Sequence, residues 1–281
     1  MRDFSADHSA LALNTATLGH NLDGYGAGWP VERVIDACAE RGFGGIVFWR
    51  REIGDRAVEI GERVRAAGMR VDGLCRTPFL TGREAPASLD EAHAAIDMAA
   101  GLGTKVLTVV TGGTEPGSKG LDASRNVLAE RLAALAPYAA ARGVTLALEP
   151  LNPMLGGNRT CLFTVEDARA MCDAVGSDAI GIAVDVYHVW WDSALAASCA
   201  RAGTRIVSFH LCDWLENTRD MLLDRGMMGD GVADLKAIRR TIESAGYQGA
   251  CEVEVFSSAD WWQQDPSAVL DTVVERFRTA C

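Results

Sequence analysis

Short apolar runs alternate with longer amphipathic stretches along the whole chain. The short runs are rich in β-branched residues and have the length of buried strands, whereas the longer stretches repeat apolar residues at helical spacing. Strands that are apolar on both faces are typical of parallel sheets covered by helices. The predicted strands are Ala10–Thr17, Gly45–Trp49, Arg70–Cys75, Lys105–Val110, Thr145–Glu149, Ile180–Asp185, Arg205–His210 and Ala250–Val255. The predicted helices are Pro30–Glu40, Asp55–Ala67, Leu89–Leu102, Leu121–Ala141, Val165–Ala174, Ser193–Ala202, Leu235–Ala245 and Pro266–Thr279.

Local signals mark the ends of these helices. Pro30 suits a first helical turn, and Thr164 resembles an N-cap that is followed by acidic residues. Repeated strand–helix units predict one α/β domain, residues 1–281, folded as a (β/α)8 TIM barrel. A doubly wound open sheet is the alternative, but no G-x-G-x-x-G motif follows the first strand. Glycines that suit left-handed C-caps stand between several helices and the next strand: Gly68, Gly103, Gly143, Gly203 and Gly246.

Composition and charge narrow the class of partner. The 281 residues carry a formal net charge of −11 without a cluster of Lys or Arg, which disfavours a nucleic-acid partner. The first nine residues lack the pattern of a signal peptide, and no apolar run approaches the roughly 18 residues of a membrane span. The eight cysteines are scattered without C-x-x-C pairs, as is typical of buried, reduced thiols. We therefore expect a cytoplasmic protein without a membrane partner.

Four predicted strands in the second half of the chain end on a side chain that can bind a metal ion. These side chains are Glu149, Asp185, His210 and Glu254. Because side chains alternate between the faces of a strand, each ligand shares its face with residues two positions before it. The carboxyl ends of barrel strands surround one opening, where active sites of this fold lie. Three carboxylates and one imidazole there predict a site for a divalent cation with open coordination positions.

The last strand leaves a choice of ligand, because Glu252 and Glu254 have the same parity and both point inward. Glu254 lies closer to the carboxyl end of the strand and is the better ligand. Glu252 would sit deeper, where an isolated charge is costly. It would therefore need a buried partner or a raised pKa.

Further polar and aromatic residues follow the strands at the same end of the predicted barrel. His20, Trp49 and Trp214 are candidate substrate-binding residues, since aromatic rings can line a pocket against the C–H face of a sugar. The tryptophans could equally pack between subunits. Arg50 and Arg51 could bind a phosphate or carboxylate, or form an ion pair at the rim.

The motifs at the last strands carry a resemblance to a known family. E-P-L-N-P, D-V-Y-H-V-W-W, F-H-L-C-D-W and E-V-E-V-F-S resemble the xylose-isomerase-like TIM barrels, in particular the sugar phosphate isomerase/epimerase family, over nearly the whole chain. The resemblance implies one Mn²⁺, Co²⁺ or Mg²⁺ ion bound by the four strand-end residues, with Glu149 and Glu254 as catalytic acid/base groups. It also implies that His188 and Arg225 contact a small carbohydrate substrate, with Arg219 as the alternative arginine. Related barrels are often homodimers or homotetramers.

One region of the chain departs from the family pattern, and this limits which family activities we expect of the protein. Ketose 3-epimerases resemble one another in a second glutamate shortly after the ligand of the fifth strand. Here that region reads Met154–Leu155–Gly156–Gly157. A 3-epimerase of free ketoses is therefore less favoured than other members of the family.

The hypothesis from the sequence is a metal-dependent sugar or keto-sugar isomerase or epimerase that abstracts a proton through a metal-stabilised enediolate. A lyase of the same family, such as an inosose-type dehydratase or a keto-glycoside-cleaving enzyme, is the alternative. The DNA-repair endonucleases that share this barrel need a histidine-rich zinc cluster, which five histidines and an acidic chain disfavour. A sugar-binding barrel without activity is the remaining alternative, and the intact set of ligands argues against it.

Overall fold

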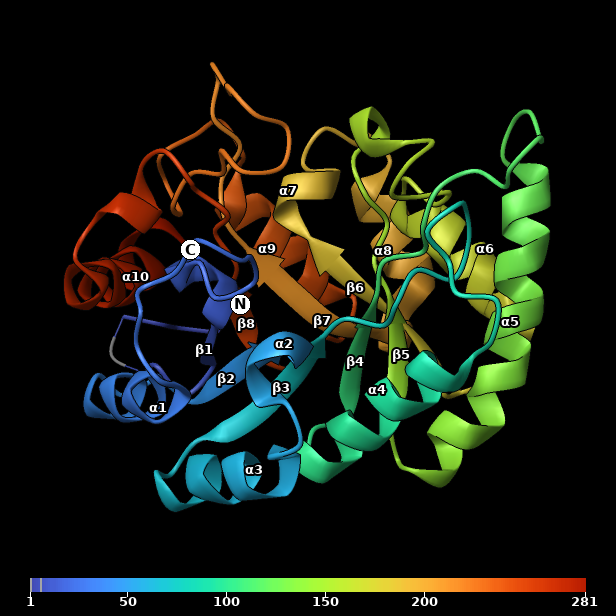
Figure 1. The fold of residues 1–281 in the computed structure, drawn as a ribbon. Helices are drawn as coiled ribbons and strands as arrows, with labels where there is room; N and C mark the ends of the chain where they lie inside the picture. The colour runs from blue at the N-terminus through green and yellow to red at the C-terminus, as the bar shows by residue number, and fades with distance from the viewer. Residues whose placement is uncertain (1, 6) are drawn as a thin grey trace.

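The computed structural model describes residues 2–5 and 7–281. Across these residues, eight parallel strands close into a barrel in the order of the sequence, and helices surround it (Figure 1). The predicted (β/α)8 TIM barrel is confirmed. The strands are β1 (Leu11–Asn14), β2 (Gly45–Trp49), β3 (Arg70–Cys75), β4 (Val106–Val109), β5 (Thr145–Leu148), β6 (Ile180–Asp185), β7 (Ile206–Leu211) and β8 (Cys251–Val253).

Most of the longer helices follow the predicted amphipathic stretches to within one or two residues. Their apolar faces pack on the outside of the barrel and form one continuous core with the strands. The α-helices are α1 (Val31–Glu40), α2 (Arg50–Ile53), α3 (Ala57–Ala66), α4 (Asp90–Leu102), α5 (Asp122–Ala141), α6 (Val165–Val175), α7 (Val186–Val189), α8 (Leu195–Ala202), α9 (Leu235–Ser244) and α10 (Pro266–Ala280). Four 3₁₀ helices in the described residues are η1 (Thr15–Leu18), η2 (Pro153–Leu155), η3 (Gly203–Arg205) and η4 (Trp261–Gln263).

The ends of several strands differ from the prediction. The first predicted strand was too long, because the side chain of Asn14 accepts a hydrogen bond from the Ala16 N–H and starts η1. β5 stops before Glu149, and β8 stops before Glu254, so both carboxylates lie just beyond the regular ladder. The sequence also gave no sign of α2 and α7, which are single turns directly after β2 and β6. A short helix after a strand has too few residues to show a helical period.

The predicted left-handed glycine is confirmed at Gly103, whereas Gly203 ends α8 in another conformation, with φ of 53° and ψ of −129°. Gly103 has φ of 82° and caps α4 by donating its N–H to Ala100 and Ala99 carbonyls. Gly246, after α9, has φ of 104°. Only glycine adopts such angles without steric cost, so these residues let the chain reverse from each helix toward the next strand.

Strand register brings the polar ends of the last strands together. Asp185 of β6 pairs with His210 of β7, and His210 pairs in turn with Glu252 of β8. Beyond the regular strands, the Glu149 N–H donates to Val109 and the Glu254 N–H donates to Leu211. These backbone bonds hold the two glutamates at the carboxyl end of the barrel.

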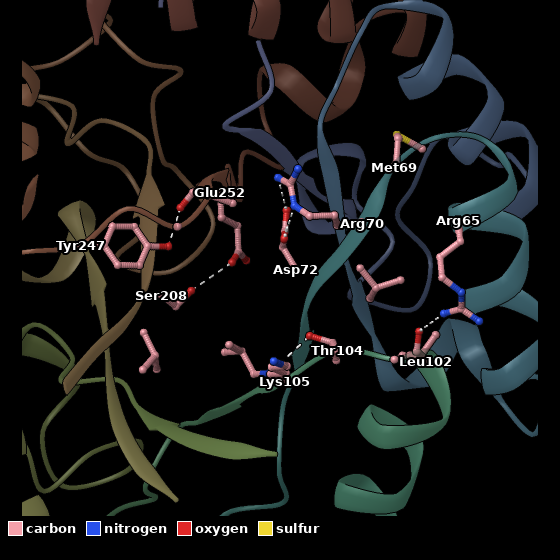
Figure 2. A pocket seen from close by; sticks show the side chains of 16 residues that line it. Arg65, Met69, Arg70, Asp72, Leu102, Thr104, Lys105, Ser208, Tyr247 and Glu252 are labelled. Atoms are coloured by element: carbon pink, nitrogen blue, oxygen red, sulfur yellow. Dashed lines mark hydrogen bonds and ion pairs between the residues drawn. The ribbon is translucent and has the colours of Figure 1, made fainter. Parts of the chain in front are cut away.

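A pocket at the opposite, amino end of the strands has about 360 Å³ open to water-sized molecules (Figure 2). We call it the lower pocket. Arg70 and Asp72 of β3 form an ion pair in it at 3.0 Å, and the Arg65 guanidinium donates to the Leu102 carbonyl. Glu252 reaches the pocket from β8, where Ser208 donates to its carboxylate at 3.4 Å. Among the described residues, no helix is long and apolar enough to cross a membrane.

Candidate metal and substrate site

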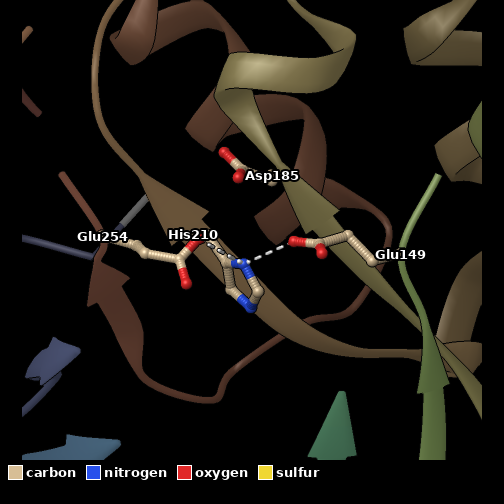
Figure 3. A group of neighbouring side chains, drawn as sticks. All are labelled: Glu149, Asp185, His210 and Glu254. Carbon is tan, nitrogen blue, oxygen red and sulfur yellow. Dashed lines mark ion pairs between the residues drawn. The ribbon is translucent and has the colours of Figure 1, made fainter. Parts of the chain in front are cut away.

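Four side chains converge at the carboxyl ends of β5 to β8. Glu149, Asp185, His210 and Glu254 each offer a ligand atom, and these atoms all lie within 4.8 Å of one another. Figure 3 shows the two glutamates on either side of the imidazole, with Asp185 close by. All four residues are buried. The structure therefore brings the predicted ligands to one point, and we call this group the ligand cluster.

The imidazole of His210 is the centre of the cluster. Its Nδ1 lies 3.1 Å from Glu149 Oε1 and 3.9 Å from Glu254 Oε2. Nδ1 is buried but makes no hydrogen bond of acceptable geometry within the described residues. The other nitrogen, Nε2, lies 3.0 Å from Ser208 Oγ. A buried nitrogen without a hydrogen bond, facing carboxylate oxygens, is the arrangement expected of a metal ligand whose second nitrogen is fixed by a neighbour.

The charges of the cluster are strongly coupled. Burial by itself lowers the pKa of His210, but Glu252, Glu149 and Glu254 together hold it well above its ordinary value. Burial raises the pKa of Glu254 to about 8, against the opposing charges of Arg225 and His210. Glu254 and the His210 imidazole therefore retain protons at neutral pH that a divalent cation would displace. The donor set fits such a cation.

Arg225 already neutralises part of this negative charge. Its NH1 lies 2.9 Å from Asp185 Oδ2 and 3.1 Å from Glu254 Oε2. Burial acts to raise the pKa of Asp185, but Arg225 and the nearby imidazoles hold it below its ordinary value. The guanidinium also stacks on Tyr187 and Phe256, at 4.5 and 4.2 Å from the ring centroids. A metal ion bound here would share two carboxylates with this arginine.

Backbone contacts explain how Arg225 reaches the cluster from a long loop. The loop after β7 folds back on itself where Asp213 N–H donates to the Gly226 carbonyl and Gly226 N–H donates to the Asp213 carbonyl. The Arg225 N–H donates to the Phe256 carbonyl at 2.8 Å. The alternative arginine, Arg219, pairs instead with Asp224 and Asp260 outside the cavity.

Glu252 lies one layer below the ligand cluster, as its parity predicts. Its Oε1 accepts a hydrogen bond of 2.6 Å from the Asn14 side chain, and its Oε2 lies 3.3 Å from His210 Nε2. Burial raises its pKa despite these partners. Cys75, Glu252 and Glu254 form a second group with metal-binding spacing. Burial raises the pKa of the Cys75 thiol well above its usual value, so the thiolate needed for metal binding is disfavoured there.

A small cavity opens beside the ligand cluster, with about 50 Å³ available to water-sized molecules. We call it the upper cavity. His188 lies in its wall, where its Nδ1 accepts a 3.2 Å hydrogen bond from the Asn152 N–H. Burial lowers the pKa of His188 to about 4, so the ring is neutral at pH 7 and its proton lies on Nε2. The cavity is lined by Trp49, Cys75, Arg76, Thr108, Val110, Glu149, Leu151, Leu155, Arg159, His188, Leu222, Arg225, Glu254 and Phe256.

Five candidate substrate-binding residues were predicted, and the structure places three of them in the upper cavity: Trp49, His188 and Arg225. The other two lie elsewhere. His20 Nδ1 lies 3.0 Å from Glu52 Oε2 in a separate shallow hollow. Trp214 packs against Tyr187 with ring centroids 4.7 Å apart, outside the residues that line the cavity.

Three polar residues at the site were missed in the sequence. Asn14 ends β1 and donates to both Glu252 and Glu254, at 2.6 and 2.8 Å. It was missed because the predicted strand ran on to Thr17, which placed Asn14 inside the strand and not at its end. Arg76 follows β3 directly, so its signal was a polar residue at a strand end, as for the ligands. Arg159 stands in an irregular loop after β5, where no periodicity indicates which way a side chain points.

Comparison with known proteins places this geometry in a family. The model of the xylose isomerase-like TIM barrel family matches residues 35–273. Protein SMc04130 of Sinorhizobium meliloti 1021 has 43% identity and a TM-score of 0.89, over 97% of this chain and 98% of that one. An inosose isomerase of Bacillus velezensis is 29% identical over 131 residues, which span 46% of this chain and 45% of that protein.

A solved structure of IolI protein with a bound zinc atom has a TM-score of 0.79 over 95% of this chain and 96% of that one. At 18% identity this likeness shows the fold alone. The family match is broader, because it covers most of the chain and includes the last four strands. The chain belongs to the xylose isomerase-like TIM barrel family.

Proposed function

We propose that the protein is a divalent-metal-dependent isomerase or epimerase of a sugar or keto-sugar. The observation that carries this proposal is the placement of Glu149 and Glu254 on opposite sides of His210, with Asp185 completing a buried set of ligands. Two carboxylates that face one point from opposite sides can remove a proton from one carbon and return a proton elsewhere. The name of the inosose isomerase relative supports the same class of reaction.

The ligand cluster supports the metal dependence. Glu149, Asp185, His210 and Glu254 would hold the ion, and its identity among Mn²⁺, Co²⁺, Mg²⁺ and zinc is open. A bound divalent cation would polarise a substrate carbonyl and favour negative charge on the adjacent oxygen. The zinc atom in the IolI structure, which shares the fold, is consistent with a metal in barrels of this shape.

The surrounding side chains are suited to orient a sugar. The neutral His188 ring can donate a hydrogen bond from Nε2, which lies 3.7 Å from Asp185 Oδ2 at the cavity wall. Trp49 donates its indole N–H to Asn14 at 2.9 Å, which fixes the ring at the cavity. Leu151, Leu155 and Phe256 supply apolar walls that exclude water from the carboxylates.

Substitution of the two glutamates tests the proton transfer. Metal-loaded protein is incubated in D₂O with ketoses, inososes and 3-keto-glycosides, and deuterium incorporation is followed by NMR. Glu149→Gln and Glu254→Gln should each lower the exchange rate by about 10²–10⁴-fold, because a positioned acid or base is lost. The control Glu130→Gln changes an exposed glutamate of α5 and should exchange at the native rate.

Circular dichroism and unfolding curves of all variants establish that the fold is retained. Full exchange and turnover in both active-site variants would refute the assignment. Product analysis in the same samples separates the alternative lyase: loss of water or of an aglycone would replace the isomerase proposal, whereas deuterium uptake into an intact sugar supports it.

A further inference from the structure

Arginines gather on the side of the upper cavity formed by β2, β3 and the loop after β5. Arg76 follows β3 directly, and Arg159 lies in the loop between η2 and α6; both line the cavity. Arg50 begins α2, directly after β2. The ligand cluster belongs to β5 to β8, where Arg225 already pairs with two of its carboxylates, whereas Arg76 and Arg159 line the cavity from the side of β3 and the loop after β5.

Among the described residues, none of the three guanidinium groups forms an ion pair, although Glu91 and Glu149 act on Arg50 and Arg76 from farther away. Arg76 NH1 donates to the Thr77 carbonyl at 3.1 Å, and NH1 of Arg50 is buried without any hydrogen bond. No ion pair or side-chain hydrogen bond is formed by Arg159 within the same described ranges. This is unexpected in a chain with 38 acidic and 27 basic residues, where a surface arginine readily meets a carboxylate.

Arg159 and Arg50 both repel the charge of Arg76. Burial lowers the pKa of Arg76 to about 10, and the charges of Arg159 and Arg50 act in the same direction. The group is still charged at neutral pH. Its guanidinium is held over the Phe79 ring, 4.2 Å from the centroid, so that it cannot easily move into solvent. Like charges held close together in a partly buried wall are unfavourable unless an anion completes them.

We propose that Arg76 and Arg159, with Arg50 beside them, bind a carboxylate or phosphate group of the substrate, so that the substrate is an anionic sugar. The inference rests on the proposed function, and it names the substrate class for that same site. Guanidinium groups present planar pairs of N–H donors that match the oxygens of carboxylate and phosphate. The carbonyl end of the sugar would face the ligand cluster, and its charged end would face the arginines.

Binding measurements with matched sugars test this inference directly. Isothermal titration calorimetry of the metal-loaded protein compares fructose, fructose 6-phosphate and fructuronate, which share a ketose but differ in charge. At least one anionic sugar should bind at least tenfold more tightly than fructose. Arg76→Gln and Arg159→Gln should each lower the affinity for that anion by at least tenfold and leave the affinity for fructose unchanged. The control Arg240→Gln removes an exposed arginine of α9 and should change neither affinity.

The outcomes separate the two sources of anion and the two proposals. Preference for the phosphate or for the uronate identifies the source. Equal affinity for all three sugars, or anion affinity that survives both arginine substitutions, would overturn the inference. If the inference is overturned in either way but fructose still exchanges its proton, the proposed function stands. Tight anion binding without proton exchange on any sugar of the wider panel would instead refute the proposed function.

Discussion

The upper cavity and the lower pocket lie at opposite ends of the same barrel and differ in how their charges are satisfied. The lower pocket is the larger, with about 360 Å³ against 50 Å³, but its Arg70 and Asp72 neutralise each other at 3.0 Å. Beside the upper cavity, the buried Nδ1 of His210 makes no hydrogen bond within the described residues, and Arg76 and Arg159 in the cavity wall form no ion pair there. The comparison shows that the larger pocket is not the one that lies beside the ligand cluster.

Glu252 connects the two regions. It lines the lower pocket, yet its carboxylate lies 3.3 Å from His210 and accepts a hydrogen bond from Asn14, which also donates to Glu254. Glu252 and Asn14 therefore form a hydrogen-bonded layer directly below the ligand cluster. The layer fixes the direction of His210 because Ser208 and Glu252 occupy its lower nitrogen.

The largest contrast is expected between the arginines of the two regions. Arg225→Ala leaves the buried Asp185 and Glu254 without their cation, and should lower the free energy of unfolding by about 3–5 kcal/mol. Arg70→Ala removes a half-exposed partner of Asp72 and should cost about 0–1 kcal/mol. Urea unfolding measures both. Added Mn²⁺ should restore part of the loss in Arg225→Ala only, because the ion replaces the missing positive charge. Equal losses would contradict the distinction between the regions.

The next largest difference is expected in Mn²⁺ affinity, between variants of one aspartate in each region. Asp185→Asn keeps the oxygen that accepts from the Tyr187 N–H but removes a charged ligand. Its affinity for Mn²⁺ should fall by more than the roughly 10–100-fold that outer-shell changes cost. Asp72→Asn makes the same change in the lower pocket and should bind Mn²⁺ as the native protein does. Calorimetry of the metal-free variants measures both affinities, and a loss confined to Asp72→Asn would move the metal site to the other end.

The smallest effect is expected for Glu252→Gln. The amide oxygen can still accept from Asn14, and the side chain is not one of the four proposed ligands. Its Mn²⁺ affinity should stay within about tenfold of the native value, which corresponds to about 1.4 kcal/mol. Glu254→Gln is the matched change one layer higher and should lose much more. If Glu252→Gln lost more Mn²⁺ affinity than Glu254→Gln, the metal site would lie lower in the barrel, in the group with Cys75.

The sequence predicts the parts of this site that depend on strand ends. The positions of Glu149, Asp185 and His210 could be predicted because the carboxyl ends of all barrel strands surround one opening. A polar residue that ends an apolar strand there lies at that opening. Parity also predicted that Glu252 would need a partner, and Asn14 and His210 supply it. The same reasoning applied to Arg76, which directly follows β3, but not to Asn14, which lay inside a predicted strand that was too long.

Loop residues were harder to predict. Trp49 is the last residue of β2, whereas His20 and Trp214 lie beyond the ends of β1 and β7. His20 pairs with Glu52, and Trp214 packs on Tyr187. The direction of a loop side chain depends on contacts with segments far away in the sequence, and no local period reports them. Arg225 was suggested by resemblance, but only its backbone bond to Phe256 explains why it points into the site.

By itself, the sequence determined the barrel, the order of its strands and the four candidate ligands at their ends, because alternation and helical spacing are local properties of the chain. The tertiary structure decided how charge is distributed around those ligands. It placed Arg225 between Asp185 and Glu254, and it brought Arg76 and Arg159 to one wall of the upper cavity, with Arg50 of α2 close enough to act on Arg76. Electrostatic interactions act through space, so the arrangement of these charges appears only when the barrel closes.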